Sequence, residues 1–297
     1  MFTGKLCVVT GGGSGIGQAL CEELARAGAG GVYVVDITRE SAQKVDASLP
    51  SLATFHDHHQ LNHHFRCDFG AADVGNEDDM KRVIHDAWKS FGSVDIFFSN
   101  AGILTIGGVE DVSNEQWEQI WNVNVMSHLF AARQLFPLWR LKKQSGSLSS
   151  NLTEEGENAD VSSEGIFVIT ASAAGLLMQM GSLPYHVTKH AAVSVADWLA
   201  VHHHDDGVRV HCICPQAVQT KMLTSSAAPG GGSAGLDGIL SPRDVAVETI
   251  QAIEKRKFLV LPHPKVKRYF ERKASDYDRW LNGMRRVHRH FFSPTKL

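Results

Sequence analysis

The sequence has no long apolar run and few cysteines, and both absences exclude classes of protein. No segment reaches the roughly 18 consecutive apolar residues of a membrane span, so we predict no transmembrane helix. The first residues, MFTGKLCVVT, lead directly into an apolar run, so we expect no signal peptide and a cytoplasmic protein. The cysteines are odd in number, scattered and mostly in apolar runs, which indicates reduced packing thiols rather than disulfides.

Charge is nearly balanced over the whole chain but unevenly distributed along it. From Glu254 onward there are 13 Lys/Arg and 4 Asp/Glu, a net charge of +9, which leaves -12 for residues 1–253. A basic tail can contact nucleic acid, an anionic membrane or an acidic partner, or it can lie against its own acidic body. We favour the last alternative and predict no nucleic-acid partner. The final TKL resembles the peroxisomal S-K-L signal, so a peroxisomal location is an alternative.

Histidine is abundant, with dense groups in HDHHQLNHH (56–64) and HHHDD (202–206). Their mixed spacing in polar contexts is typical of solvated side chains rather than metal ligands. Cys212 and Cys214 form a CxC pair without a second cysteine pair, which argues against a zinc site. We therefore predict no metal site.

Short apolar runs alternate with helical patterns along the chain. Strands are expected at 5–10, 31–36, 94–99, 165–170, 208–214 and 258–262, and helices at about 18–29, 38–48, 77–91, from 113 and at 185–204. The alternation predicts an α/β fold: a Rossmann-type doubly wound parallel sheet in three α/β/α layers. We expect a single catalytic domain over 1–262, a polar disordered insertion at about 142–164, and a basic, aromatic, helical extension over 263–297.

A glycine-rich turn, TGGGSGIG (Thr10 to Gly17), lies between the first strand and the first helix. Such a turn lets the backbone approach a pyrophosphate, which the helix N-terminus also attracts. Asp36 ends the next strand, 25 residues after Gly11, where a carboxylate can bind both ribose hydroxyls and repel a 2′-phosphate. We therefore predict NAD as the cofactor and NADP as the alternative, with Arg39 as the one nearby cation that could favour NADP.

The arrangement TGxxxGxG, followed by Asp73-Val74, SNAG (99–102), Asn124 in WNVNV, Ser172 in ITASAAG, YHVTK (185–189) and CPQAVQT, resembles the classical short-chain dehydrogenase/reductase family. The resemblance covers nearly all of residues 5–262. It implies catalytic roles for Asn124, Ser172, Tyr185 and Lys189. The cofactor-binding residues that it implies are Gly11, Ser14, Gly15, Ile16, Gly17, Asp36, Ile37, Asp73, Val74, Asn100, Ala101, Gly102, Tyr185, Lys189, Pro215, Val218 and Thr220.

Tyr185 and Lys189 are four residues apart, which places both side chains on one face of a helix. A free tyrosine titrates near ~10, so a proton acceptor at neutral pH needs a shift of ~3 units, or ~4 kcal/mol. One cation at ~4 Å with an effective dielectric constant of ~20 supplies about that energy. We therefore expect Lys189 to lower the pKa of Tyr185. The resemblance implies that Ser172 holds the substrate oxygen, Lys189 the nicotinamide ribose and Asn124 a proton-relay water.

The substrate expected from these residues is a secondary alcohol or its ketone, of medium size and apolar, because Met178 and Met180 would line the substrate side. The alternative is that both methionines pack in the hydrophobic core. Two residues depart from the family pattern: Gln216 replaces a glycine after the proline, and His186 follows Tyr185 where a small residue is commoner. The resemblance also implies a homodimer or homotetramer. The alternative functions are an NADP-linked ketoreductase and a non-enzymatic dinucleotide-binding sensor.

Overall fold

The computed structural model of the 297-residue chain describes residues 1–53, 65–149, 164–224 and 235–292. Seven parallel strands form one sheet in the order β3-β2-β1-β4-β5-β6-β7. The order reverses between β1 and β4, so the chain diverges there to both sides. The expected doubly wound α/β fold is confirmed.

The strands are β1 (Leu6–Thr10), β2 (Gly31–Asp36), β3 (Arg66–Ala71), β4 (Ile96–Ser99), β5 (Gly165–Thr170), β6 (Val208–Ile213) and β7 (Leu259–Val260). All six strands expected from the sequence form, with small differences at their ends. The sequence did not assign β3, because Arg66 and Asp68 interrupt its apolar pattern. Charged side chains are tolerated at a sheet edge, and β3 pairs on one side only, with β2.

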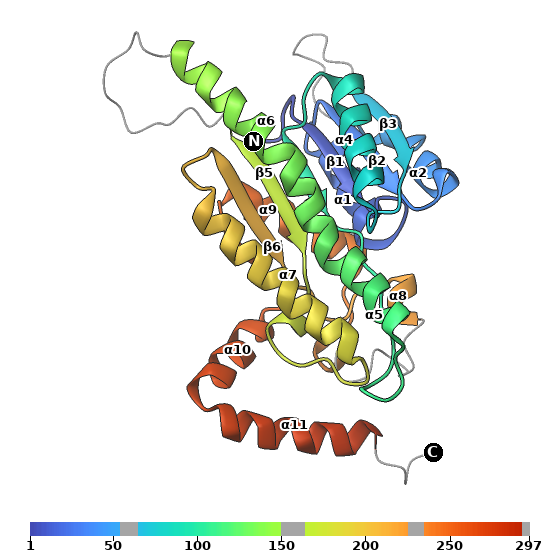
Figure 1. Ribbon diagram of the computed structural model, residues 1–297, viewed down its shortest axis with the longest axis vertical. Coiled ribbons are helices and arrows are strands. Elements are labelled where there is room, and N and C mark those ends of the chain that lie inside the picture. Colours follow the sequence, from blue (N-terminus) through green and yellow to red (C-terminus); the bar gives the residue numbers. More distant parts are fainter. Residues whose placement is uncertain (54–64, 150–163, 225–234, 293–297) are drawn as a thin grey trace.

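Helices cover both faces of the sheet (Figure 1). They are α1 (Gly15–Arg26), α2 (Arg39–Asp46), α3 (Leu49–Ala53), α4 (Glu77–Phe91), α5 (Asn114–Trp121), a π-helical turn η1 (Asn122–Met126), α6 (Ser127–Ser149), a 3₁₀ turn η3 (Ala173–Gly175), α7 (Leu183–His202), α8 (Lys221–Thr224), α9 (Pro242–Glu254), α10 (Lys265–Ser275) and α11 (Tyr277–Phe292). The capping box expected at Ser113 is present at the start of α5.

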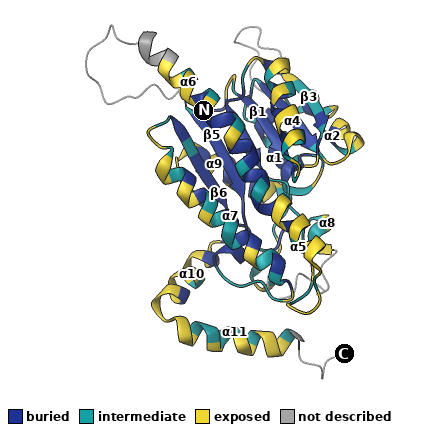
Figure 2. Cartoon of the chain, in the orientation of Figure 1, coloured by how far each residue is buried: buried dark blue, intermediate teal, exposed yellow. Residues whose placement is uncertain are grey.

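Alternate residues of the central strands enter two separate hydrophobic cores. Val8 and Phe97 pack with buried side chains of α4, α6 and α7. Val9 and Phe98 point the other way and pack with α1, α2, α3 and α9. Figure 2 shows the strands as the most buried part of the molecule, with exposed residues on the outer sides of the helices. Burial on both faces explains why these strands are continuous apolar runs.

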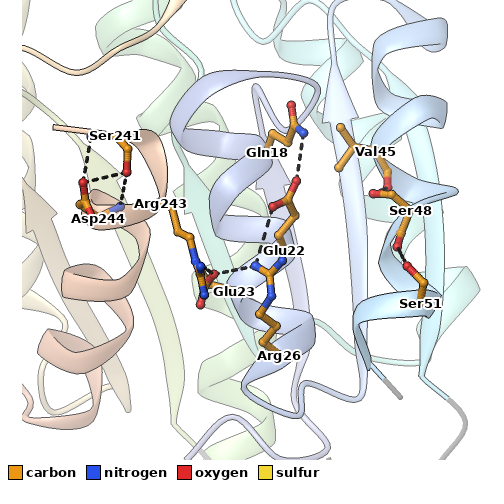
Figure 3. Close-up of polar contacts among 10 residues, drawn as sticks. All are labelled: Gln18, Glu22, Glu23, Arg26, Val45, Ser48, Ser51, Ser241, Arg243 and Asp244. Atoms are coloured by element: carbon orange, nitrogen blue, oxygen red, sulfur yellow. Dashed lines mark hydrogen bonds and ion pairs between the residues drawn. The ribbon is translucent and has the colours of Figure 1, made fainter. Parts of the chain in front are cut away.

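An ion pair joins α1 to α9 on the second face of the sheet (Figure 3). Glu23 of α1 accepts from Arg26 at 2.6 Å on the same helix and from Arg243 of α9 at 2.9 Å. The start of α9 is held by a capping box in which Ser241 and Asp244 bond each other. These contacts fix the position of α1, the helix that begins within the glycine-rich turn.

The C-terminal extension forms two helices, α10 and α11, beyond the carboxyl ends of the strands (Figure 1). The prediction of a disordered insertion over 142–164 is wrong for its first residues, because α6 continues as a helix to Ser149. Residues 150–163 lie outside the described part of the chain. Among the helices of the described residues, none is both long and apolar enough to cross a bilayer.

Candidate active site

A cleft of about 1110 Å³ opens at the carboxyl ends of the strands, where the strand order reverses. All seventeen residues expected to bind the cofactor line it, together with Ser172, while Asn124 does not. One end of the cleft is formed by the glycine-rich turn and the tip of β2. Tyr185, Lys189 and Ser172 lie further along it, and helices α10 and α11 contribute its outer wall.

The glycine-rich turn has the shape that a dinucleotide pyrophosphate requires. Gly11 and Gly15 have φ of 64° and 55°, values that favour glycine. A Cβ on Gly17 would lie 2.0 Å from the carbonyl oxygen of Gly11, so the turn and α1 touch without room for a side chain. In the described structure no side-chain hydrogen bond caps α1 at Ser14, and no acid lies in its first turn. Backbone N–H groups are therefore available for an anion, and these residues fit the expected cofactor.

Asp36 lies at the rim of the cleft, at the carboxyl end of β2. Its Oδ2 accepts from the backbone N–H of Gly13 at 2.9 Å, and its Oδ1 accepts from that of Ile37 at 2.9 Å. The bond from Gly13 joins the carboxylate to the glycine-rich turn, and the two bonds together set its orientation. Arg39 is directed elsewhere: its guanidinium lies 4.6 Å from the centre of the Phe69 ring, and the cleft-lining residues do not include it.

Asn100 joins the ends of three strands behind the end of the cleft that the glycine-rich turn forms. Its Nδ2 donates to the Thr10 carbonyl at 2.9 Å, and its Oδ1 accepts from the Thr170 hydroxyl at 3.0 Å. The Thr10 hydroxyl accepts from the backbone N–H groups of Asn100 and Ala101 and donates to the Phe98 carbonyl. The sequence placed Asn100 at the cofactor but did not assign these positioning roles to Thr10 and Thr170. The position of both threonines at strand ends is the sequence signal that could have identified these roles.

Tyr185 and Lys189 share one face of α7, as their spacing predicted. The Lys189 ammonium lies 5.5 Å from the centre of the Tyr185 ring and donates to the Thr170 carbonyl at 2.9 Å. Lys189 is buried, and the loss of solvation lowers its pKa to about 8. Ser172 lies at the end of β5, where its hydroxyl donates to the Pro215 carbonyl at 3.3 Å.

The expected sign of the Tyr185 shift is wrong for the protein without cofactor. Burial raises the pKa of Tyr185 above its ordinary value, although a hydrogen bond with Ser172 lowers it in part. Desolvation of the phenolate therefore outweighs the hydrogen bond with Ser172. Spacing along a helix does not report burial, so the sequence could not reveal this desolvation.

Asn124 is completely buried behind the cleft, in the π-helical turn that precedes α6. Its Oδ1 accepts from the Ile103 N–H at 2.8 Å, and its Nδ2 donates to the Ile103 carbonyl at 2.9 Å and to the Thr188 hydroxyl at 3.2 Å. A Cβ on Gly102 would lie 3.3 Å from Asn124 Oδ1 and 3.4 Å from Lys189 Nζ. Asn124 therefore holds the loop after β4 against α7, next to the Lys189 ammonium.

The two departures from the family pattern have different positions. Gln216 lines the cleft, and its backbone N–H donates to His263 Nδ1 at 3.1 Å. His186 points to the loop between η3 and α7, residues 176–182, which we call the Met178 loop. There its Nδ1 accepts from the Gln179 N–H at 3.4 Å. Gln216 thus belongs to the cleft, while His186 supports one of its walls.

The histidines of the HHHDD group (202–206) bond to different partners. His202 Nδ1 bonds to the Trp198 carbonyl at 2.9 Å and His203 Nδ1 to the Asp206 carboxylate at 2.7 Å. Residues 56–64 lie outside the described part of the chain. Within the described ranges no group of three or more His, Cys, Asp or Glu side chains is placed to hold a metal ion.

Comparison with known proteins gives the family. The sequence matches the family described as short chain dehydrogenase over residues 5–229. The chain belongs to the short-chain dehydrogenase family. Its curated relatives include the 1-deoxy-11-beta-hydroxypentalenate dehydrogenase of Streptomyces exfoliatus, 30% identical over 86% of this chain and 81% of that protein. They also include the meso-2,3-butanediol dehydrogenase of Serratia marcescens, 28% identical over 74% of each chain.

Solved structures agree with this assignment to the short-chain dehydrogenase family. A 3-ketoacyl-(acyl-carrier-protein) reductase from Brucella melitensis, complexed with NADH, is 25% identical, with a TM-score of 0.72 over 88% of this chain and 97% of that chain. A short-chain dehydrogenase/reductase from Burkholderia phymatum, in complex with NAD, is 24% identical and has a TM-score of 0.76 over 93% and 95%. The second likeness concerns the fold alone.

Proposed function

We propose that this short-chain dehydrogenase uses NAD to interconvert a secondary alcohol and its ketone, with an apolar substrate of medium size. The proposal rests on one cleft that has a glycine-rich turn and Asp36 at one end and Tyr185 beside Lys189 and Ser172 further along. Asp36 supports NAD over NADP because its carboxylate lies at the rim and Arg39 is directed to Phe69. The hydroxy-dehydrogenases among its relatives support the reaction type.

The chain's own residues supply the acid–base chemistry. When bound, the nicotinamide ring accepts or supplies the hydride. The Tyr185 hydroxyl takes the proton of the alcohol during oxidation and returns it during reduction. Ser172 holds the substrate oxygen in this proposal, which is supported by its hydrogen bond with Tyr185, a bond that lowers the pKa of the phenol in part. Lys189, held by the Thr170 carbonyl, keeps a positive charge next to the phenol below pH ~8, the pKa that burial gives it.

The test mixes purified protein and NAD with a panel of hydroxylated lipids, steroids and aliphatic alcohols, and follows the absorbance of reduced cofactor. We expect turnover that falls by at least about a hundredfold in Tyr185→Phe, a typical contribution of general acid–base catalysis. Undiminished turnover in this variant would contradict the mechanism. Tight NAD binding without turnover of any compound would favour the non-enzymatic sensor.

We also propose that the protein forms a homodimer or homotetramer through its long helices. Trp198 and Val201 on α7 are 53% and 76% exposed, and Leu141 on α6 is 60% exposed. Large apolar side chains gathered on exposed helices are typical of subunit interfaces. Light scattering of the purified chain and of Trp198→Glu tests this proposal, because the charge would dissociate such an interface.

The cytoplasmic location stays a prediction, with the peroxisome as its alternative. A fluorescent protein fused to the N-terminus leaves the final TKL accessible and reports the location directly. Movement of the fusion from peroxisomes to the cytosol on removal of TKL would support the alternative.

A further inference from the structure

The outer half of the cleft has a wall that no residue of the Rossmann sheet provides. One face of α11 lines it: Arg279, Gly283 and Arg286 follow one another at helical spacing. Trp280, Met284 and Val287, each one position further on, form a parallel apolar row that also lines the cleft. This face of α11 therefore presents a cationic row beside an apolar row.

The α11 wall is attached to the body of the protein through Lys273 of α10. Its ammonium is buried and donates to the carbonyls of Leu176 and Leu177, at 2.8 and 3.2 Å. The same ammonium lies 4.9 Å from the centre of the Trp280 ring on α11. Leu177 lines the cleft and comes shortly after Ser172, so α11 is held close to the proposed reaction centre.

The loop after Ser172 contributes a second apolar surface to the same cleft. Leu177, Met178 and Met180 line it together with Met284 of α11. Flexible thioether side chains adapt to extended apolar ligands of different shapes. The outer half is therefore apolar along its walls, with positive charge at one edge.

That positive charge has no acidic partner in the described part of the chain. Arg272, Arg279 and Arg286 line the cleft, and no ion pair between described residues involves them. Two acids, Asp237 and Asp276, line the same cleft. Asp237 pairs with Lys265 at 3.1 Å and accepts from Tyr269 at 3.1 Å. Asp276 Oδ1 accepts from the backbone N–H of Arg279 at 3.0 Å, as a helix cap does.

We propose that the substrate is an amphipathic secondary alcohol that carries an oxyanion, either a carboxylate or a phosphate ester. Its apolar chain lies between the Met178 loop and α11, and the oxyanion binds Arg279 and Arg286, with Arg272 at the edge. Guanidinium groups bind both oxyanions through paired hydrogen bonds. The assignment names the substrate class of the proposed dehydrogenase and rests on that function.

The kinetic test compares hydroxy fatty acids with their methyl esters, and alkyl diol monophosphates with the free diols, each with NAD. We expect a kcat/KM at least about tenfold higher for the anionic member, mainly through a lower KM. This ratio falls about tenfold in Arg279→Gln and in Arg286→Gln, because each loses a charged hydrogen bond. A preference in the fatty acid pair identifies a carboxylate substrate, and a preference in the diol pair identifies a phosphate ester.

The control is Arg285→Gln, which removes the same charge from the same helix. Arg285 does not line the cleft, and its guanidinium donates to Asn282 at 2.8 Å. The anion-to-neutral ratio therefore stays unchanged in this variant. Equal use of anionic and neutral members by the unaltered protein overturns the proposal, as does an equal loss in Arg285→Gln, which would indicate only a long-range field.

Calorimetry separates this inference from the proposed reaction. Decanoate and decanamide are titrated into the NAD-saturated protein at low and high salt. We expect tighter binding of decanoate, weakened by salt and by Arg279→Gln. If decanoate binds in this way but no alcohol is oxidised, the dehydrogenase assignment fails and the anion site stands. If alcohols are oxidised but decanoate binds no better than decanamide, the anion site fails alone.

Discussion

Replacing Asp36 with Asn removes the charge that we expect to discriminate between NAD and NADP. Asparagine keeps the size of the side chain and one acceptor oxygen for the Gly13 N–H, which now bonds to Asp36 Oδ2 at 2.9 Å. The substitution therefore tests charge with little change of shape. It requires no knowledge of the substrate, because cofactor binding is measured alone.

The expected size of the effect follows from Coulomb's law. Two like unit charges ~4 Å apart repel by ~4 kcal/mol at an effective dielectric constant of ~20, and by ~1 kcal/mol in water. Asp36 is partly exposed, so its repulsion of a 2′-phosphate falls between these limits. With ~1.4 kcal/mol for each factor of ten, the unaltered protein prefers NAD by roughly fivefold to several hundredfold.

Isothermal titration calorimetry with both cofactors measures this preference. We expect the ratio of NAD to NADP affinity to fall by roughly fivefold to several hundredfold in Asp36→Asn. The matched control is Glu40→Gln, which removes an exposed acid from the first turn of α2, outside the cleft. An unchanged ratio in Asp36→Asn, or an equal change in Glu40→Gln, would refute the assigned role of Asp36.

Three further substitutions test the site and the core. Gly17→Ala places a Cβ 2.0 Å from the Gly11 carbonyl oxygen, so calorimetry should find NAD affinity reduced at least about tenfold; affinity near that of the unaltered protein would contradict the close approach. Burial lowers the pKa of Lys189 from 10.5 to about 8, so the folded protein releases this proton before the unfolded chain does. The free energy of unfolding of the unaltered protein, minus that of Lys189→Met, therefore rises by up to ~3 kcal/mol between pH 8 and 10.5. Urea melts in which this difference does not change with pH would rule out the lowered pKa of Lys189. Gly165→Ala places a Cβ 2.0 Å from Trp139, a buried ring, and should lower the free energy of unfolding by ~1–3 kcal/mol in urea; an unchanged midpoint would mean that the ring moves at no cost.

The local features of this protein could be predicted from sequence because their causes are local. A β-branched apolar run, then glycines, then helical spacing identified β1, the turn and α1, and the four-residue spacing placed Tyr185 and Lys189 on one helix face. β3 was missed because tolerance of charge at its positions depends on its place at the sheet edge. The helical part of the 142–164 segment was missed because its polar composition resembles that of a loop.

The sequence by itself determined most of the strands and helices, the glycine-rich turn and the identity of the groups that we propose for proton transfer, since each depends on neighbours within a few residues. Only the tertiary structure decided the sign of the Tyr185 pKa shift, because burial arises from residues distant in the chain. It also decided that Asn100 joins β1 to β5 and that arginines of α11 face the cleft. Contacts between remote segments have no signature in residue spacing, and they set the solvation and charge on which the proposed chemistry depends.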